Sequence, residues 1–322
     1  MTPAGAGIKV FSPSGKQVAG PAVARGSVLS AAVETGESGT FVVSWQVLAS
    51  DTHPSRGAFA FAVGQRSANP YMTLLSSGQA GTTTPLGLAL QALARWIHFI
   101  GFALAFGSVV YEVVARRERR AHRLVGAGIV LLIAAEPLVL IAQLASLSFD
   151  GDTAVAVLGS EFGRLLGLRL AAALSLWAVW TLDSPWPVIG IGALVAILDG
   201  ASAHAIQGLA GAGLVLTSVH VTAMGLWLGG VAAFLADPDK RFTRYALGTF
   251  GLAAASGALL AVAHFGSWSA LASDYGAALM VKVLLIAAVL AAALVRRHRL
   301  ELSLLVAVVG VAAVLAALPP PR

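Results

Sequence analysis

The stretch LVGAGIVLLIAAEPLVLIAQLASLS, residues 124–148, decides the fold class of this chain. It holds a single ionisable side chain, Glu136, and it is longer than the roughly 20 residues that a helix needs to cross a bilayer. Seven further apolar runs flank it, at about 86–112, 160–182, 186–205, 211–235, 246–266, 276–296 and 301–318. Their pattern does not alternate as the strands of a membrane barrel do. The sequence therefore predicts a mainly α, polytopic membrane protein with a bundle of eight transmembrane helices in a lipid bilayer.

The composition agrees with a membrane protein and excludes other classes. Of 322 residues, 57% are hydrophobic and only 11% are charged. The net charge of +6 does not indicate a nucleic-acid partner, because much of the basic excess lies in short clusters between apolar runs. The chain has no cysteine, so histidine, methionine and carboxylates are its available metal ligands.

Three basic clusters predict the orientation in the membrane. They comprise Arg116, Arg117, Arg119, Arg120 and Arg123, then Lys240, Arg241 and Arg244, and finally Arg296, Arg297 and Arg299. All three fall on one side if every apolar run crosses, and the intervening loops near 149–159, 205–210 and 267–275 hold no Lys or Arg. By the positive-inside rule we expect a multi-pass protein with the N-terminal domain and the C-terminus extracytoplasmic.

The N-terminal part has a different periodicity. Residues 40–49 alternate apolar and polar side chains, and the alternation resumes at Phe59 after an expected turn at 54–57, which is typical of half-buried strands. Shorter runs at 8–11 and 28–33 supply further strands. We expect a small, incomplete Ig-like β-sandwich at 1–64, a Ser-, Thr- and Gly-rich linker at 65–85 and the eight-helix membrane domain at 86–322.

Four histidines lie inside the apolar runs, and the charge-based topology places all four in the outer half of the bilayer: His98, His204, His220 and His264. An ionisable residue inside a membrane is by default a functional candidate. His220 and Met224 are four residues apart and share a helix face, so they pair an imidazole with a thioether, as Cu(I) accepts. The alternative for each histidine is a hydrogen-bonded contact between helices.

Other polar residues share the outer half or the midplane: Arg95, Glu136, Arg164, Arg169, Asp199 and Lys282. In a low dielectric we expect them to pair with one another. Asp199 can also orient a histidine or bind a metal itself. Unpaired cations would repel Cu⁺ and would better suit the propionates of a haem, which keeps a bis-histidine haem site open as an alternative.

In the β region, Asp51 and His53 follow the strand that contains Trp45. A carboxylate and an imidazole two residues apart can reach one ion and suit Cu(II). The alternative is a polar turn before Pro54.

Several segments resemble the fusion of a CopC domain to a CopD membrane domain, as in YcnJ-type copper-uptake proteins. FVVSWQVLASDTHP at 41–54 and GAFAFAV at 57–63 are similar to the end of CopC. RWIH at 95–98, HVTAMGLWLGG at 220–230 and DYGAALMVK at 274–282 are similar to CopD segments. The resemblance implies copper ligands at Asp51 and His53. It also implies copper handling across the inner membrane, with import as the expected direction.

The resemblance has two departures. CopC-type Cu(II) sites also use an N-terminal histidine, whereas this chain begins Met1-Thr2-Pro3, so we expect a truncated CopC-like domain with an incomplete site. The methionine-rich loop that some CopC proteins use for Cu(I) does not occur here either.

We predict a copper-homeostasis protein that is not an enzyme. Its β domain would take Cu(II), directly or from a periplasmic copper carrier. It would pass copper to a Cu(I) path through His98, His204, His220, Met224 and His264 by ligand exchange. Two rival hypotheses remain: a b-type haem-binding electron-transfer subunit, and a binding or sensing scaffold without transport.

Overall fold

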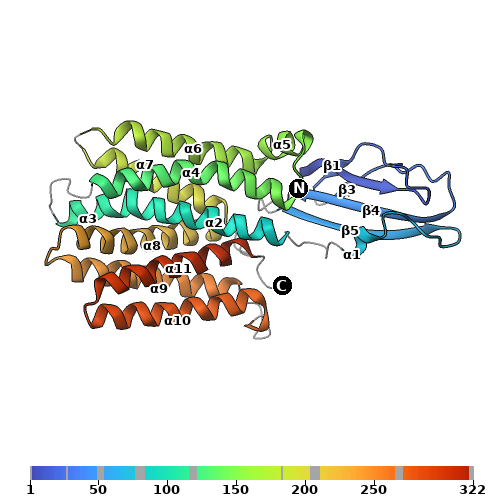
Figure 1. Ribbon diagram of the computed structural model, residues 1–322. Coiled ribbons are helices and arrows are strands. Elements are labelled where there is room, and N and C mark those ends of the chain that lie inside the picture. The colour runs from blue at the N-terminus through green and yellow to red at the C-terminus, as the bar shows by residue number, and fades with distance from the viewer. Residues whose placement is uncertain are drawn as a thin grey trace. The chain divides into compact units, whose positions relative to one another are not determined.

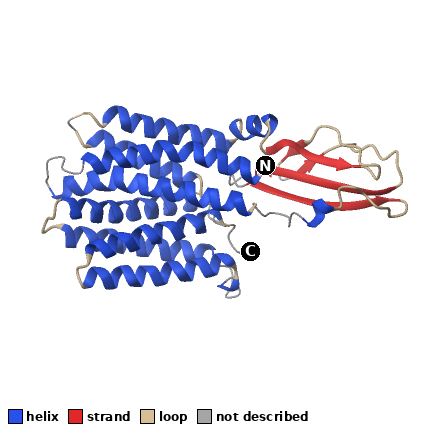
Figure 2. Ribbon diagram, in the orientation of Figure 1, coloured by secondary structure: helices blue, strands red, loops and turns tan. Residues whose placement is uncertain are grey.

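The computed structural model describes residues 2–26, 28–48, 54–76, 84–115, 122–182, 184–203, 211–264 and 271–318. The chain is mostly helical, and its strands are confined to the N-terminal region (Figure 2). It divides into two compact units. One comprises residues 1–88 and 141–164, and the other comprises residues 89–140 and 165–322.

The β region consists of two small antiparallel sheets. Strands β1 (Thr2–Phe11), β4 (Gly39–Leu48) and β5 (Pro54–Val63) form one sheet in the order β1-β4-β5, and β2 (Val23–Arg25) pairs with β3 (Val28–Ser30). The apolar alternation read from the sequence provides the core. The rings of Phe41 and Phe61 stack across β4 and β5 with centroids 5.2 Å apart.

The predicted turn at 54–57 is wrong, because these residues begin β5. Leu48 pairs with Pro54 and Trp45 pairs with Gly57. Proline is tolerated as the first residue of a strand. Gly57 fits because the Trp45 ring covers it: a Cβ at Gly57 would lie 2.7 Å from that ring. Residue 54 therefore already belongs to the strand that pairs with β4.

Residues that follow β5 contact the β region. The Asn69 side chain is buried and donates to the carbonyl oxygens of Ser12 and Thr40, each at 2.9 Å. The Tyr71 ring stacks on Phe11 at 3.9 Å, just before the short helix α1 (Thr73–Ser76). This part of the predicted linker thus packs on the β-sheet.

The expected loop at 149–159 contains a helix, α5 (Gly151–Leu158). Its N-cap is Asp150, whose side chain accepts a hydrogen bond from the Thr153 amide at 2.8 Å. Asp150 is exposed, and its hydrogen bonds, chiefly from the Ser148 hydroxyl, lower the pKa of its carboxyl. The aspartate cap is a local helix-start signal that the apolar-run analysis did not use.

Seven helical segments in the described part of the chain are long and apolar enough to cross a membrane. The first, Pro85–Ala115, combines α2 (Pro85–Phe102), the π-helix η1 (Ala103–Gly107) and α3 (Ser108–Ala115). The others are α4 (His122–Ser146), α6 (Glu161–Val179), α8 (Ala212–Ala236), α9 (Phe242–His264), α10 (Asp274–Leu294) and α11 (His298–Ala317). Each coincides with an apolar run that the sequence identified.

The prediction of eight spanning helices is wrong by one among the described residues, because α7 is too short to span a bilayer. This helix, Trp186–Ala201, has 16 residues. It is therefore about 24 Å long, less than the roughly 30 Å of a bilayer core. Its C-cap is Ser202, whose backbone amide donates to carbonyls of the last turn. The helix packs against α8 within the helical unit.

The end of α3 and the junctions α8–α9 and α10–α11 lie at one end of the bundle (Figure 1). Arg241, between α8 and α9, donates to the carbonyl of Ala115 at the end of α3, at 2.8 Å. His298, at the start of α11, packs its ring on Phe234 and Phe242. The α8–α9 and α10–α11 junctions therefore lie together beside the end of α3, as the second and third basic clusters predicted, while the first cluster except Arg123 lies outside the described residues.

Glycines allow η1 and α8 to touch backbone to backbone. A Cβ at Gly107 would lie 2.2 Å from the Gly225 carbonyl oxygen, and one at Gly229 would lie 2.1 Å from that of Ala103. Small residues permit such close helix packing in membranes. This contact fixes the first membrane segment, which carries His98, against α8, which carries His220.

Candidate functional site

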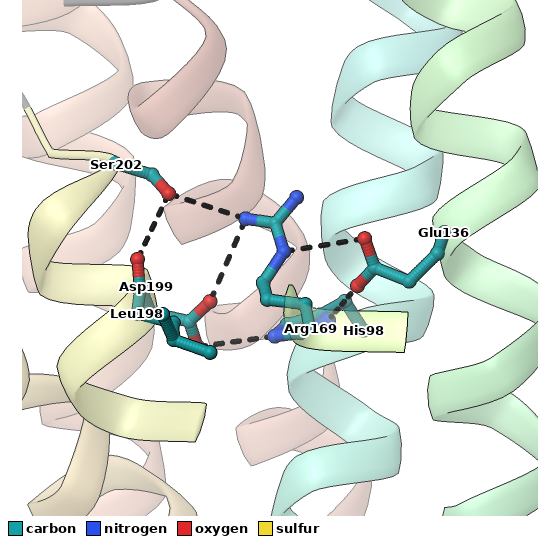
Figure 3. Close-up of polar contacts among 6 residues, drawn as sticks. All are labelled: His98, Glu136, Arg169, Leu198, Asp199 and Ser202. Carbon is teal, nitrogen blue, oxygen red and sulfur yellow. Dashed lines mark hydrogen bonds and ion pairs between the residues drawn. The ribbon is translucent and has the colours of Figure 1, made fainter. Parts of the chain in front are cut away.

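A buried ionic cluster surrounds His98 of α2 (Figure 3). His98 is 4% exposed. Its Nδ1 lies 3.1 Å from Glu136 Oε1 of α4, and its Nε2 lies 3.0 Å from Asp199 Oδ2 of α7. The imidazole thus bridges two carboxylates that come from different helices.

Arg169 of α6 closes the cluster on the other side of the carboxylates (Figure 3). Its Nε donates to Glu136 Oε2 at 3.2 Å, and its Nη1 lies 3.8 Å from Asp199 Oδ1. Nη1 also donates to Ser202 Oγ at 3.3 Å. Because Asp199 and Ser202 lie at the C-terminal end of α7, the guanidinium also complements the negative end of that helix dipole. Four helices therefore meet at one set of charges.

The hydrogen bonds define the charge state that this cluster satisfies best. A carboxylate oxygen only accepts hydrogen bonds, so two ionised carboxylates require a proton on both nitrogens of His98. The imidazolium and Arg169 then carry two positive charges against the two negative charges of Glu136 and Asp199. A buried set of charges persists only when it is paired and hydrogen-bonded in this way.

The sequence identified these residues as polar groups that should pair, but it did not predict which residue pairs with which. Arg169 and Glu136 do pair, and Asp199 contacts His98. Two other cations make different contacts. Arg164 pairs with Glu161 on its own helix, and Arg95 donates to the carbonyl of Ala316.

A second polar cluster surrounds His220 of α8. Its Nδ1 lies 3.1 Å from both the Ala253 carbonyl oxygen and the Ser256 hydroxyl of α9. Its Nε2 lies 3.4 Å from Lys282 Nζ of α10. No carboxylate is present in this cluster as far as the chain is described. The two buried histidines therefore have separate sets of partners.

The remaining described candidates lie near helix ends or in the apolar core. Met224 is partly buried in the apolar cluster that includes Phe250 of α9 and Ile286 of α10. It lies four residues after His220 on α8, so the two side chains share a helix face. His264 ends α9, and its Nδ1 lies 2.8 Å from the Leu260 carbonyl oxygen of the same helix.

Three predicted ligands, Asp51, His53 and His204, lie outside the described residues. Within the described ranges, no group of three or more His, Asp or Glu side chains is arranged to hold a metal ion. A haem ligand would need a nitrogen lone pair from its histidine. His98 does not offer one while both of its nitrogens face carboxylates.

Comparison with known families gives two matches. Residues 1–64 match the CopC domain, and residues 82–214 match the copper resistance protein D-like, N-terminal domain. The second match includes the whole His98 cluster and stops before His220. Neither the curated proteins nor the solved structures gave a match.

The fold, the buried polar clusters and the two matches define a class: this is a copper-resistance or copper-homeostasis membrane protein. Its helices make it a multi-pass protein. More specifically, the two matched regions are a CopC domain at 1–64 joined to a copper resistance protein D-like N-terminal domain at 82–214, as in a CopC–CopD fusion.

Proposed function

We propose that this protein imports copper across the bacterial cytoplasmic membrane by ligand exchange, without a chemical turnover. Copper would enter from the extracytoplasmic side, where Asp51 and His53 of the CopC domain would take Cu(II), directly or from a periplasmic carrier. An external one-electron reductant on the extracytoplasmic side would convert the Cu(II) to Cu(I) before it enters the bundle. Inside the bundle, Cu(I) would move between imidazole and thioether ligands, which bind it without deprotonation of a thiol.

The observation that carries this proposal is the environment of His220. The Ala253 carbonyl can only accept, so His220 donates to it from Nδ1, and the Nε2 lone pair is left as the metal-binding group. Met224 lies one helical turn further along the same side of α8. An imidazole nitrogen and a thioether are thus available on one helix face, in surroundings that Cu(I) tolerates.

His98 would take part differently. Each of its nitrogens faces a carboxylate, so it can bind copper only after a proton and one carboxylate contact are released. We therefore assign the central Cu(I) step to His220 and Met224. The other copper ligands on the path would be His98, His204 and His264. Of these, His204 and His264 would lie near the extracytoplasmic entrance.

The test is copper uptake by the full-length protein in proteoliposomes that enclose a Cu(I)-sensitive dye. Wild-type protein should accumulate Cu(I), and His220→Ala should abolish most of the uptake. Leu259→Ala, an exposed position on the neighbouring helix α9, is the control and should transport normally. Equal uptake by wild-type and His220→Ala protein would overturn the assignment. A Soret band in the purified protein that disappears in a histidine variant would favour the haem alternative.

A further inference from the structure

The contact between His220 and Lys282 carries a further inference, which rests on the proposed copper site. Lys282 Nζ lies 3.4 Å from His220 Nε2. This is the nitrogen that the Ala253 contact leaves with its lone pair. An ammonium has only donors to offer, so it directs a hydrogen bond at the lone pair that a metal would need.

The hydrogen bonds fix this arrangement. Ser256 Oγ donates to the Leu252 carbonyl oxygen at 2.6 Å, so its oxygen is free to accept from His220 Nδ1. Both acceptors near Nδ1 therefore require the proton on that nitrogen. Gly257 leaves room for the ring in this position, because a Cβ there would lie 2.8 Å from His220 Cε1.

Lys282 differs from the other described cations of the bundle interior. Arg169 faces two carboxylates, and Arg95 faces a backbone carbonyl. Among the described residues, Lys282 has no carboxylate within ion-pair distance, and its recorded polar partner is His220. A lysine is costly in an apolar bundle, so a cation without a countercharge beside a predicted ligand calls for a role.

We propose that Lys282 is a built-in competitor of the copper ion at His220. When the site is empty, the Lys282 ammonium group lies beside His220 Nε2, where the copper ion would bind. It must move away when Cu(I) binds. Lysine suits this role because its charge sits on a flexible four-carbon stem. The nearby positive charge also weakens the bound state. His220 would consequently hold copper loosely enough to pass it on, which ligand exchange requires.

The test compares equilibrium binding with transport. Lys282→Leu removes the charge without adding a metal ligand, and Lys282→Arg keeps the charge. Cu(I) affinity is measured on full-length protein in detergent, under reducing conditions, by competition with the chromogenic chelator bicinchoninate. Lys282→Leu should bind Cu(I) about tenfold more tightly and release it more slowly, so its transport rate should fall. Lys282→Arg should remain close to wild type in affinity.

Three further variants separate a competitor from a structural lysine. Val283→Leu, at an exposed neighbouring position, controls for the added leucine and should change neither quantity. Lys282→Gln provides a second neutral variant if Lys282→Leu does not fold. The double variant His220→Ala/Lys282→Leu should lose the gain in affinity.

The outcomes distinguish this inference from the proposed function. If folded Lys282→Leu and Lys282→Gln bind Cu(I) no more tightly than wild type, while His220→Ala weakens binding, the competitor role is wrong and the copper site stands. If His220→Ala leaves Cu(I) binding unchanged, both in the wild-type protein and in the Lys282→Leu variant, the copper site itself is wrong. The competitor role then fails with it.

Discussion

The two histidine clusters each contain a basic residue and a serine, but they differ in charge balance. His98 and His220 both lie on membrane helices, and each contacts a cluster that includes a basic residue. His98 lies between two carboxylates that Arg169 also neutralises, whereas His220 faces Lys282 and no described carboxylate. The comparison teaches that the countercharges decide what an intramembrane histidine can do. A balanced histidine is held in place, and an unbalanced one keeps a lone pair for a ligand.

The balanced cluster also joins more of the bundle. It connects α2, α4, α6 and α7, all within the copper resistance protein D-like match or overlapping it. The His220 cluster connects α8, α9 and α10, and its residues His220, Ser256 and Lys282 all follow that match. We therefore expect the first cluster to govern stability and the second to govern copper binding.

The largest expected effect concerns the orientation in the membrane of the helical bundle that holds both clusters. It is all-or-none, because each reporter lies either in the cytoplasm or outside it. Reporter fusions after Arg120, Arg244 and Arg299 should be cytoplasmic, and fusions after Asp152 and Ser273 should be exported. This pattern requires the chain to cross the membrane once between α6 and α8, where α7 alone is too short to span it. An Arg244 reporter on the exported side would show that α7 does not complete a crossing.

The next effect concerns stability. Arg169→Leu should lower the free energy of unfolding in detergent by about 3–5 kcal/mol, because it leaves buried carboxylates without their countercharge. Arg164→Leu, on the same helix, is the matched control. Its ion pair with Glu161 is exposed, at 67% and 52% of the two side chains, and should contribute only about 0–1 kcal/mol. Equal losses in the two variants would contradict the importance of charge balance.

A third prediction compares the effects of replacing each of the two histidines with alanine. His220→Ala should lower the Cu(I) affinity about tenfold or more and leave the unfolding temperature nearly unchanged. His98→Ala should lower the unfolding temperature more strongly, since it leaves two carboxylates against one guanidinium. Both quantities can be measured on the same preparations by chelator competition and by thermal unfolding. The reverse pattern would break the comparison between the clusters.

A smaller effect is expected for the sulfur. Met224→Leu keeps the volume and the apolar character of the side chain and removes the thioether. We expect Cu(I) affinity to fall about threefold to tenfold, with no loss of stability, as measured by chelator competition. An unchanged affinity would make Met224 a packing residue of the apolar cluster.

The smallest effect concerns the glycine that positions the His220 ring. Gly257→Ala would place a Cβ 2.8 Å from His220 Cε1, so the ring must shift and Cu(I) affinity should fall about twofold to fivefold. Gly251→Ala, on the same helix, meets no atom within 4 Å and should bind Cu(I) as wild type does. If the two variants behave alike, the ring position does not limit binding.

Parts of the fold could be predicted because local physics decides them. Apolar length predicted the membrane helices, since a backbone in lipid must satisfy its own hydrogen bonds. Alternation predicted β4 and most of β5. The turn at 54–57 was misjudged because Pro54 and Gly57 are turn residues in most settings. Only the Trp45 ring on the neighbouring strand makes Gly57 a strand residue.

By itself, the sequence determined the class of fold, the candidate helices and the basic end of the bundle, because each depends on composition over a short window. Only the tertiary structure decided the partners of the two histidines. Glu136 and Asp199 lie 38 and 101 positions from His98, and Lys282 lies 62 positions from His220. No local pattern links residues so far apart. Their contacts are set by helix packing, where glycines let backbones touch and α7 ends early enough to bring Asp199 and Ser202 to Arg169.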